Sequence, residues 1–344
     1  MRAECISNSE RHAESGFRRG VDGARPRALP APQTVILRRV TIQADLLLLL
    51  ASLIWGVAFV AQQNAAKSLD ALSIMAIRFL MGAAILAPLI IVRRARGVNA
   101  SSPGALLWSG GIFAGLAMLI AAYLQQKGIE STTASSAGFI TGLYVLFVPL
   151  IGLLFGHRVG WSAWLGVTLA TVGLYLLSVS AELHMSRGDL LVLGCAVVWA
   201  IHVLIIGRYA PRCDPIELAA VQFLVTGLIA FMFMMRNGLP EWSHVSSAWM
   251  SLVYLGALAV AVAFTLQVVG QRTAPPTHAA ILLSMESPFA AIAGAFLAAE
   301  RLSSREYVGC ALMLAGILVS QLLGSNAAKK SAETNASFLT KSQR

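Results

Sequence analysis

The sequence predicts an all-α integral membrane protein, with ten transmembrane helices arranged as two inverted five-helix repeats. Three observations predict this fold class: an apolar composition, ten apolar stretches of membrane-spanning length, and similarity between the two halves of the chain. Of the 344 residues, 57% are hydrophobic and 12% are charged, and the mean hydropathy is +0.72. A soluble domain carries roughly 25% charged residues. The composition therefore excludes an ordinary soluble enzyme, and it equally excludes a disordered chain.

The apolar stretches define the expected helices. A membrane-spanning helix needs about 20 mostly apolar residues, and short connections between such helices predict one compact bundle, because lipid tolerates neither open sheets nor exposed loops. The windows that satisfy this length are 45–63, 72–92, 105–124, 132–154, 161–179, 189–207, 216–235, 248–269, 277–297 and 306–323.

These windows divide the chain into four expected parts. Residues 1–43 are rich in Arg, Pro, Gly and Ser without a helical period, which predicts a disordered basic cytoplasmic tail. Residues 44–180 form the first five-helix repeat and residues 188–323 the second. Residues 324–344 form a polar cytoplasmic tail.

The distribution of Lys and Arg predicts the orientation of the chain. With the amino terminus in the cytoplasm, 19 Lys and Arg residues lie inside and 6 lie outside, Arg78 being within the membrane. Without the two tails the balance is 7 against 6, so the tails decide the prediction. The excess on the inner side places both termini in the cytoplasm. Because the basic residues flank apolar stretches, the net charge of +10 indicates topology and not a nucleic-acid partner.

The two halves of the chain match each other in order. An odd number of helices in each half places the two copies in opposite orientations, and inverted repeats are typical of secondary transporters with a midplane binding site. A shift of 144 residues places Asp45 on Asp189, Trp55 on Trp199 and Asp70 on Asp214.

These motifs resemble those of the drug/metabolite transporter superfamily, and more narrowly those of EamA-type ten-helix permeases. The resemblance covers about residues 42–323. It implies a secondary transporter of the bacterial inner membrane that exports a small metabolite or drug-like compound by alternating access, and it implies no cofactor. The turn of the second repeat contains Glu300, but the matching position in the first repeat is His157. Because the carboxylate is absent there, we assign that turn no role shared by the two repeats. The matching segments are Asp45 to Trp55-Gly56, Arg78-Phe79-Leu80, Ala298-Ala299-Glu300-Arg301-Leu302 against Gly156-His157-Arg158, and Gly309 to Gly316.

Glu286 is the sharpest candidate for a functional residue. It lies near the middle of the ninth window, where an unpaired carboxylate is costly and such residues usually face a cavity or an ion path. Pro288 removes a helical hydrogen bond close by. Glu286 is therefore expected to be a protonatable group that lines the substrate path. The alternative is a structural carboxyl group bonded to Ser284, Ser287 or another helix.

Four further residues are candidates for the cavity. Arg78 is the intramembrane cation, and its counterpart in the second repeat is the neutral Gln222. Snorkelling or a structural pair is the favoured interpretation of Arg78, and a charge partner for Glu286 or for an anionic substrate is the alternative. The matched mid-span residues Trp55 and Trp199 predict a cavity wall or gate, or else simple packing. Tyr144 adds a hydroxyl group.

Several polar and small residues have two interpretations. His202 is a candidate proton relay, and so is His278, although a lone histidine is more often a packing residue. The amides near helix ends suit zwitterionic substrates, but interhelical ties are favoured for each one. Glycine pairs such as Gly111 and Gly115 favour close helix packing and, less strongly, a dimer seam. The amides are Gln62, Gln63, Asn64, Gln125, Gln126, Gln267 and Gln271.

The expected partners follow from what the sequence carries. It has no nucleotide-binding loop, hydrolase motif or metal-ligand spacing, which favours transport driven by a gradient, with a proton as the candidate coupling ion. We expect a small-molecule substrate, membrane lipid and either a monomer or a homodimer. An uptake permease, facilitator or exchanger is the alternative function, and a membrane-embedded enzyme is less favoured.

Overall fold

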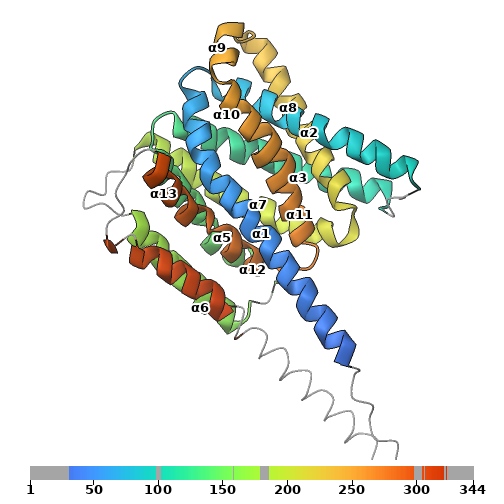
Figure 1. The fold of residues 1–344 in the computed structure, drawn as a ribbon, viewed down its shortest axis with the longest axis vertical. Helices are drawn as coiled ribbons and strands as arrows, with labels where there is room; N and C mark the ends of the chain where they lie inside the picture. Colours follow the sequence, from blue (N-terminus) through green and yellow to red (C-terminus); the bar gives the residue numbers. More distant parts are fainter. Residues whose placement is uncertain are drawn as a thin grey trace, which may run out of the picture. The chain divides into compact units, whose positions relative to one another are not determined.

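The computed structural model describes residues 31–97, 102–157, 159–178, 186–297, 304–305, 307–320 and 323. They form helices joined by short connections, without a strand among them (Figure 1). Residues 1–39 and 40–344 form two separate units, and the packing described here is that of the second.

The helices follow one another along the chain in an order that matches most of the predicted windows. The first half contains α1 (Ala31–Ala66), α2 (Ala71–Ala95), α3 (Gly104–Ile129), α4 (Ala134–Gly142), α5 (Tyr144–Leu154) and α6 (Trp161–Ser178). The second half contains α7 (Arg187–Tyr209), η1 (Ala210–Arg212), α8 (Pro215–Asn237), α9 (Trp242–Ser247), α10 (Trp249–Val253), η2 (Tyr254–Phe264), α11 (Thr265–Gly270), α12 (Pro276–Leu283) and α13 (Glu286–Leu297).

Seven helices in the described part of the chain are long and apolar enough to cross a membrane. Two more predicted windows correspond to shorter apolar helices, Trp161–Leu176 and Tyr307–Ser320. The chain is therefore an all-helical, multi-pass membrane protein. The seven are Ile42–Ala66, Ala71–Ala95, Gly104–Ile129, Ser136–Leu154, Arg187–Arg212, Pro215–Asn237 and Trp249–Gly270.

The remaining window, 277–297, is not one continuous helix. It consists of α12 and α13, which are separated at Ser284 and Met285. Pro288 explains the break, because it has no N–H group to donate to the carbonyl of Ser284 four residues earlier. The interruption therefore places Glu286 at the first turn of a new helix.

The amino-terminal side of α1 differs from the expected tail. The helix begins at Ala31, so residues 31–43 belong to it, whereas the sequence indicated no helix before residue 44. Glu300 and Arg301 of the second-repeat turn lie outside the described residues.

Equivalent positions of the two halves have equivalent structural roles. The repeat-related residues Asp70 and Asp214 both cap the second helix of their half, each accepting hydrogen bonds from the amides two and three residues further on. The helix α6 packs against the helix Tyr307–Ser320 (Figure 1), where an added methyl group at Gly166 or Gly173 would collide with the backbone opposite. These contacts have the reciprocity expected of two related halves.

Close packing of α3 against α8 explains one pair of spaced glycines. Gly111 faces Val221, and Gly115 faces Val225, so closely that a methyl group at either glycine would collide with the valine. Small residues allow such approach between membrane helices. This glycine pair is therefore used within the chain.

Candidate functional site

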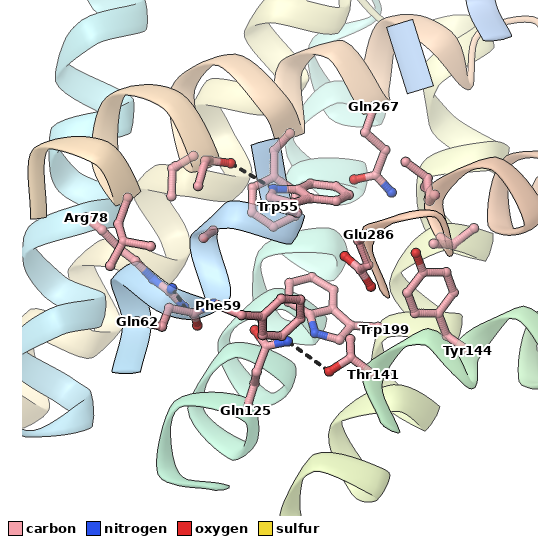
Figure 2. A pocket seen from close by; sticks show the side chains of 17 residues that line it. Trp55, Phe59, Gln62, Arg78, Gln125, Thr141, Tyr144, Trp199, Gln267 and Glu286 are labelled. Atoms are coloured by element: carbon pink, nitrogen blue, oxygen red, sulfur yellow. Dashed lines mark hydrogen bonds between the residues drawn. The ribbon is translucent and has the colours of Figure 1, made fainter. Parts of the chain in front are cut away.

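A cavity in the middle of the bundle brings together residues from both halves of the chain (Figure 2). Its walls are aromatic and aliphatic, with a few polar groups, as is typical of small-molecule sites. The aromatic residues are Trp55, Phe59, Tyr144, Trp199 and Phe264; the polar ones are Gln62, Arg78, Gln125, Thr141, Gln267 and Glu286.

The five residues predicted for the cavity all line it: Glu286, Trp55, Trp199, Tyr144 and Arg78. They come from α13, α1, α7, α5 and α2, so helices of both repeats contribute. The shared wall position of the two tryptophans follows from their equivalent places on the first helix of each repeat.

Glu286 is 4% exposed, and its Oε1 atom has no hydrogen-bond partner in the described part of the chain. The two serines that were expected as alternative partners bind elsewhere. Ser284 donates to the carbonyl of Ile281 at 2.8 Å, and Ser287 donates to the carbonyl of Gly138 at 2.7 Å. Tyr144 lies on the same side of the cavity as Glu286 (Figure 2), which makes Glu286 the nearest acidic group to its buried hydroxyl.

Arg78 is 5% exposed and donates from Nη1 to Oε1 of Gln62 at 3.1 Å. Its guanidinium carbon lies 4.9 Å from the ring centre of Phe79, which is a cation–π contact. Among the described residues its Nε atom has no hydrogen-bond partner, and no carboxylate forms an ion pair with it. Of the two favoured interpretations, the contact with Gln62 is a structural pair, whereas snorkelling is not seen, because the side chain lines the cavity.

Phe264 joins the two tryptophans. Its ring centre lies 4.6 Å from that of Trp55 and 5.5 Å from that of Trp199, with the second pair stacked at 26°. Phe264 ends the π-helix η2, whose wider turns often occur at functional sites. Sequence analysis missed Phe264, as it missed Phe59 and Thr141, because apolar and hydroxyl residues within a span carry no signal of their own.

The cavity amides serve also as ties between helices. Gln125 of α3 donates to the hydroxyl oxygen of Thr141 of α4 at 3.1 Å. Gln267 donates at 3.0 Å to Oε1 of Gln271, one turn further along the same segment, and Gln271 in turn donates to the carbonyl of Val203 on α7 at 2.9 Å. Oε1 of Gln267 has no partner among the described residues. Ties between helices are thus present, and a role of these amides in substrate binding stays a prediction.

The two histidines lie outside the cavity wall. His202 is fully buried, and its Nε2 atom lies 2.9 Å from Oε1 of Gln222. His278 lies 2.8 Å from Oδ1 of Asp45 through its Nε2 atom. In the described part of the chain, His, Cys, Asp and Glu residues form no group of three or more that could hold a metal ion.

The family model described as the EamA-like transporter family matches this chain twice, over residues 42–179 and 186–322. The chain belongs to the EamA-like transporter family. It is accordingly a membrane transporter whose two halves each carry one copy of the family's repeat. The two matched segments are the same halves that the shift of 144 residues relates to each other. Membership of this family, together with the names of its relatives, indicates a transporter and not an enzyme.

Relatives of this EamA-like transporter carry similar names. An uncharacterized transporter of Archaeoglobus fulgidus is 28% identical over 282 residues, covering 82% of this chain and 86% of the relative. The uncharacterized transporter YwfM of Bacillus subtilis is 26% identical, covering 80% of this chain and 92% of the relative. A protein of known crystal structure is similar in fold, with a TM-score of 0.67 and 20% identity over 83% of this chain and 98% of that one.

Proposed function

We propose that this EamA-like transporter exports a small metabolite or drug-like compound that carries both a positive and a negative group. The single observation that supports this substrate class is the presence of one cationic and one acidic side chain, not paired with each other, in the same buried cavity. Arg78 and Glu286 both line it. In Figure 2 they lie on either side of Trp55 and Phe59.

The chemistry of the cavity favours such a substrate over a singly charged one. A charge held away from water is costly unless it is paired. A substrate carboxylate would pair with Arg78, and a substrate amine with Glu286, so one amphoteric molecule would satisfy both. The aromatic walls formed by Trp199 and Phe264 would take an apolar part of the substrate, and their ring faces would also attract a cationic group.

The transport cycle that we propose is alternating access, in which the two repeats rock about the central cavity. Glu286 is the proposed proton-carrying group, and a proton gradient is the proposed energy source. His202, bonded to Gln222 behind the cavity wall, is a weaker candidate for a relay. The proposed location is the bacterial inner membrane, and the Lys and Arg distribution supports an orientation with both termini in the cytoplasm.

The test is efflux from cells that express the protein, preloaded with compounds from three classes: amphoteric, purely anionic and purely cationic. The compounds are matched in size and in aromatic content. We expect faster efflux of the amphoteric class, with the difference abolished by a protonophore. Efflux of only one singly charged class would overturn the proposed substrate class.

Direction and coupling are separated in the same assay. Accumulation of the amphoteric compound by expressing cells would overturn export and support the uptake alternative. Faster efflux that ignores the protonophore would overturn proton coupling and support facilitated diffusion or exchange. The variant Glu286→Gln tests the proposed proton-carrying group in this assay. Its matched control is Glu241→Gln, which changes an exposed carboxylate just before α9.

A further inference from the structure

We propose that two arginine–carboxylate pairs form an ionic latch between the repeats, which holds the transporter closed at one end and must open when the cavity faces that end. The latch consists of Arg93 and Arg94 at the end of α2, with Asp214 and Glu217 at the start of α8. The proposal rests on the alternating-access cycle proposed above, but its test does not need a substrate.

The latch joins the second helix of the first repeat to the second helix of the other. Arg93 Nη2 lies 2.7 Å from Asp214 Oδ2. Arg94 reaches Glu217 Oε1 with two nitrogens, Nη2 at 2.7 Å and Nε at 2.9 Å. The carboxylate partners are shielded, with side-chain exposures of 12% for Asp214 and 8% for Glu217, whereas the Arg93 and Arg94 side chains are 31% and 64% exposed. Shielding from water strengthens such pairs relative to exposed ones.

Asp214 makes the latch part of a larger junction. Its Oδ1 atom caps α8 by accepting from the amides of Ile216 and Glu217, which leaves Oδ2 for Arg93. Its own amide donates to the hydroxyl oxygen of Ser102, in the connection before α3. The carboxylate of Asp214 therefore joins the end of α2 to the start of α8, and its backbone amide adds the connection before α3.

A third contact between the repeats lies at the same end of the bundle. His278, in the first turn of α12, lies 2.8 Å from Asp45 of α1, with side-chain exposures of 17% and 12%. Successive spanning helices alternate in direction, so the start of the spanning part of α1 (Ile42–Ala66), the end of α2 and the starts of α8 and α12 face the same side. This side is the proposed cytoplasmic one.

The opposite end lacks the latch at its repeat-equivalent positions. The shift of 144 residues relates Arg93 and Arg94 to Asn237 and Gly238, and it relates Glu217 to Ser73. Asp70, the counterpart of Asp214, accepts instead from the hydroxyl group of Ser73 on its own helix, at 2.6 Å. A carboxylate–hydroxyl hydrogen bond within one helix thus stands where the other end has an arginine pair between the repeats.

The third contact shows the same asymmetry. Asp189, the counterpart of Asp45, accepts a hydrogen bond at 2.5 Å from the hydroxyl group of Thr132, just before α4. The ion pair between Lys127 and Glu130, at that end, is local to one turn and does not bridge the repeats. At these repeat-equivalent positions of the described residues the two ends are therefore tied unequally, and unequal ties bias the population toward the conformation with the stronger end closed.

A native cysteine reports on the latch. Cys213 immediately precedes Asp214 and is 3% exposed. In full-length protein with Cys5→Ser, Cys195→Ala and Cys310→Ser, a small permeant maleimide can modify only Cys213. We expect Arg93→Gln/Arg94→Gln to raise the labelling rate by about tenfold, as loss of two partly shielded ion pairs implies. Arg96→Gln, at an exposed arginine beyond the latch on the same helix end, is the matched control.

A second thiol separates opening of the path from local fraying. Val203 lines the cavity on α7. In the chain without native cysteines, Val203→Cys in inside-out vesicles should react faster with an impermeant maleimide when the latch is neutralised. The swap Arg94→Glu/Glu217→Arg should restore slow labelling that Arg94→Glu alone does not. Equal labelling of the latch variants and Arg96→Gln, or faster labelling confined to Cys213, would overturn the latch, whereas absence of any flux would overturn only the proposed function.

Discussion

Trp55 donates its indole N–H to the backbone carbonyl of Ala259 at 3.0 Å, which fastens the first helix of one repeat to the π-helix of the other. The contact is reciprocated one turn away, where the Tyr254 hydroxyl donates to the carbonyl of Ile54 at 2.8 Å. Two aromatic side chains thus cross the same interface in opposite directions. The position of Phe264 beside Trp55 follows from this fastening, because both residues belong to the joined segments.

Replacement of Trp55 by Phe should weaken this junction. The ring is kept but the donor to Ala259 is lost, so we expect a loss of about 1 kcal/mol in stability. The measurement is the midpoint of thermal unfolding in detergent. Trp242→Phe, at an exposed position in α9, is the control. An unchanged midpoint for Trp55→Phe would mean that the hydrogen bond contributes nothing to stability.

Replacement of Glu286 by Gln should reduce efflux by about tenfold and flatten its dependence on pH, because the amide keeps the size of the side chain but cannot exchange a proton. The measurement is efflux rate between pH 6 and 8, with Glu286→Asp as the conservative variant that should retain pH dependence. Full activity with an unchanged pH profile in Glu286→Gln would remove this residue from the mechanism.

Replacement of Arg78 by Gln should lower the affinity for an amphoteric substrate by about tenfold or more, as expected for loss of a charge-assisted hydrogen bond. An analogue without the carboxylate should be affected little. Gln is the residue at the repeat-equivalent position 222, so the variant suits the fold. Competition binding with both compounds measures the difference, and an equal loss for the two would argue against an Arg78–carboxylate contact.

Replacement of Gly111 by Leu should destabilise the protein by about 2 kcal/mol, because the side chain would collide with Val221 of α8. The measurement is the fraction of protein that stays monodisperse after heating. Gly104→Ala, where a methyl group meets no atom within 4 Å, is the control. A stable Gly111→Leu variant would show that α3 and α8 can separate at this point.

Sequence reasoning located those features that arise from local patterns. The shift of 144 residues identified the family repeat and paired Trp55 with Trp199. Pro288 indicated an opening of the helix near Glu286, because loss of one amide donor is a local property of the sequence. For Arg78 the sequence left snorkelling and a structural pair as joint favourites, and packing of α1 against α2 provides the structural pair, with Gln62 as the partner.

Other features depend on contacts between distant segments. The π-helix η2 has no local signal in its apolar sequence, and it becomes visible only with its bonds to α1. Phe264 could therefore not be distinguished from the other apolar residues of its span. The arginines at the end of α2 counted in the sequence only toward topology, and their partners lie more than a hundred residues away.

The charged groups of the cavity do not share the twofold relationship of the scaffold and of the paired tryptophans. Arg78 is matched in the other repeat by Gln222, and the positions that correspond to Glu286, residues 142–144, are uncharged. An amphoteric substrate would therefore bind in a single orientation, with its carboxylate at α2 and its amine at α13. Such a substrate would keep this orientation as it crosses the membrane, and the two faces of the transporter would meet opposite ends of the same molecule.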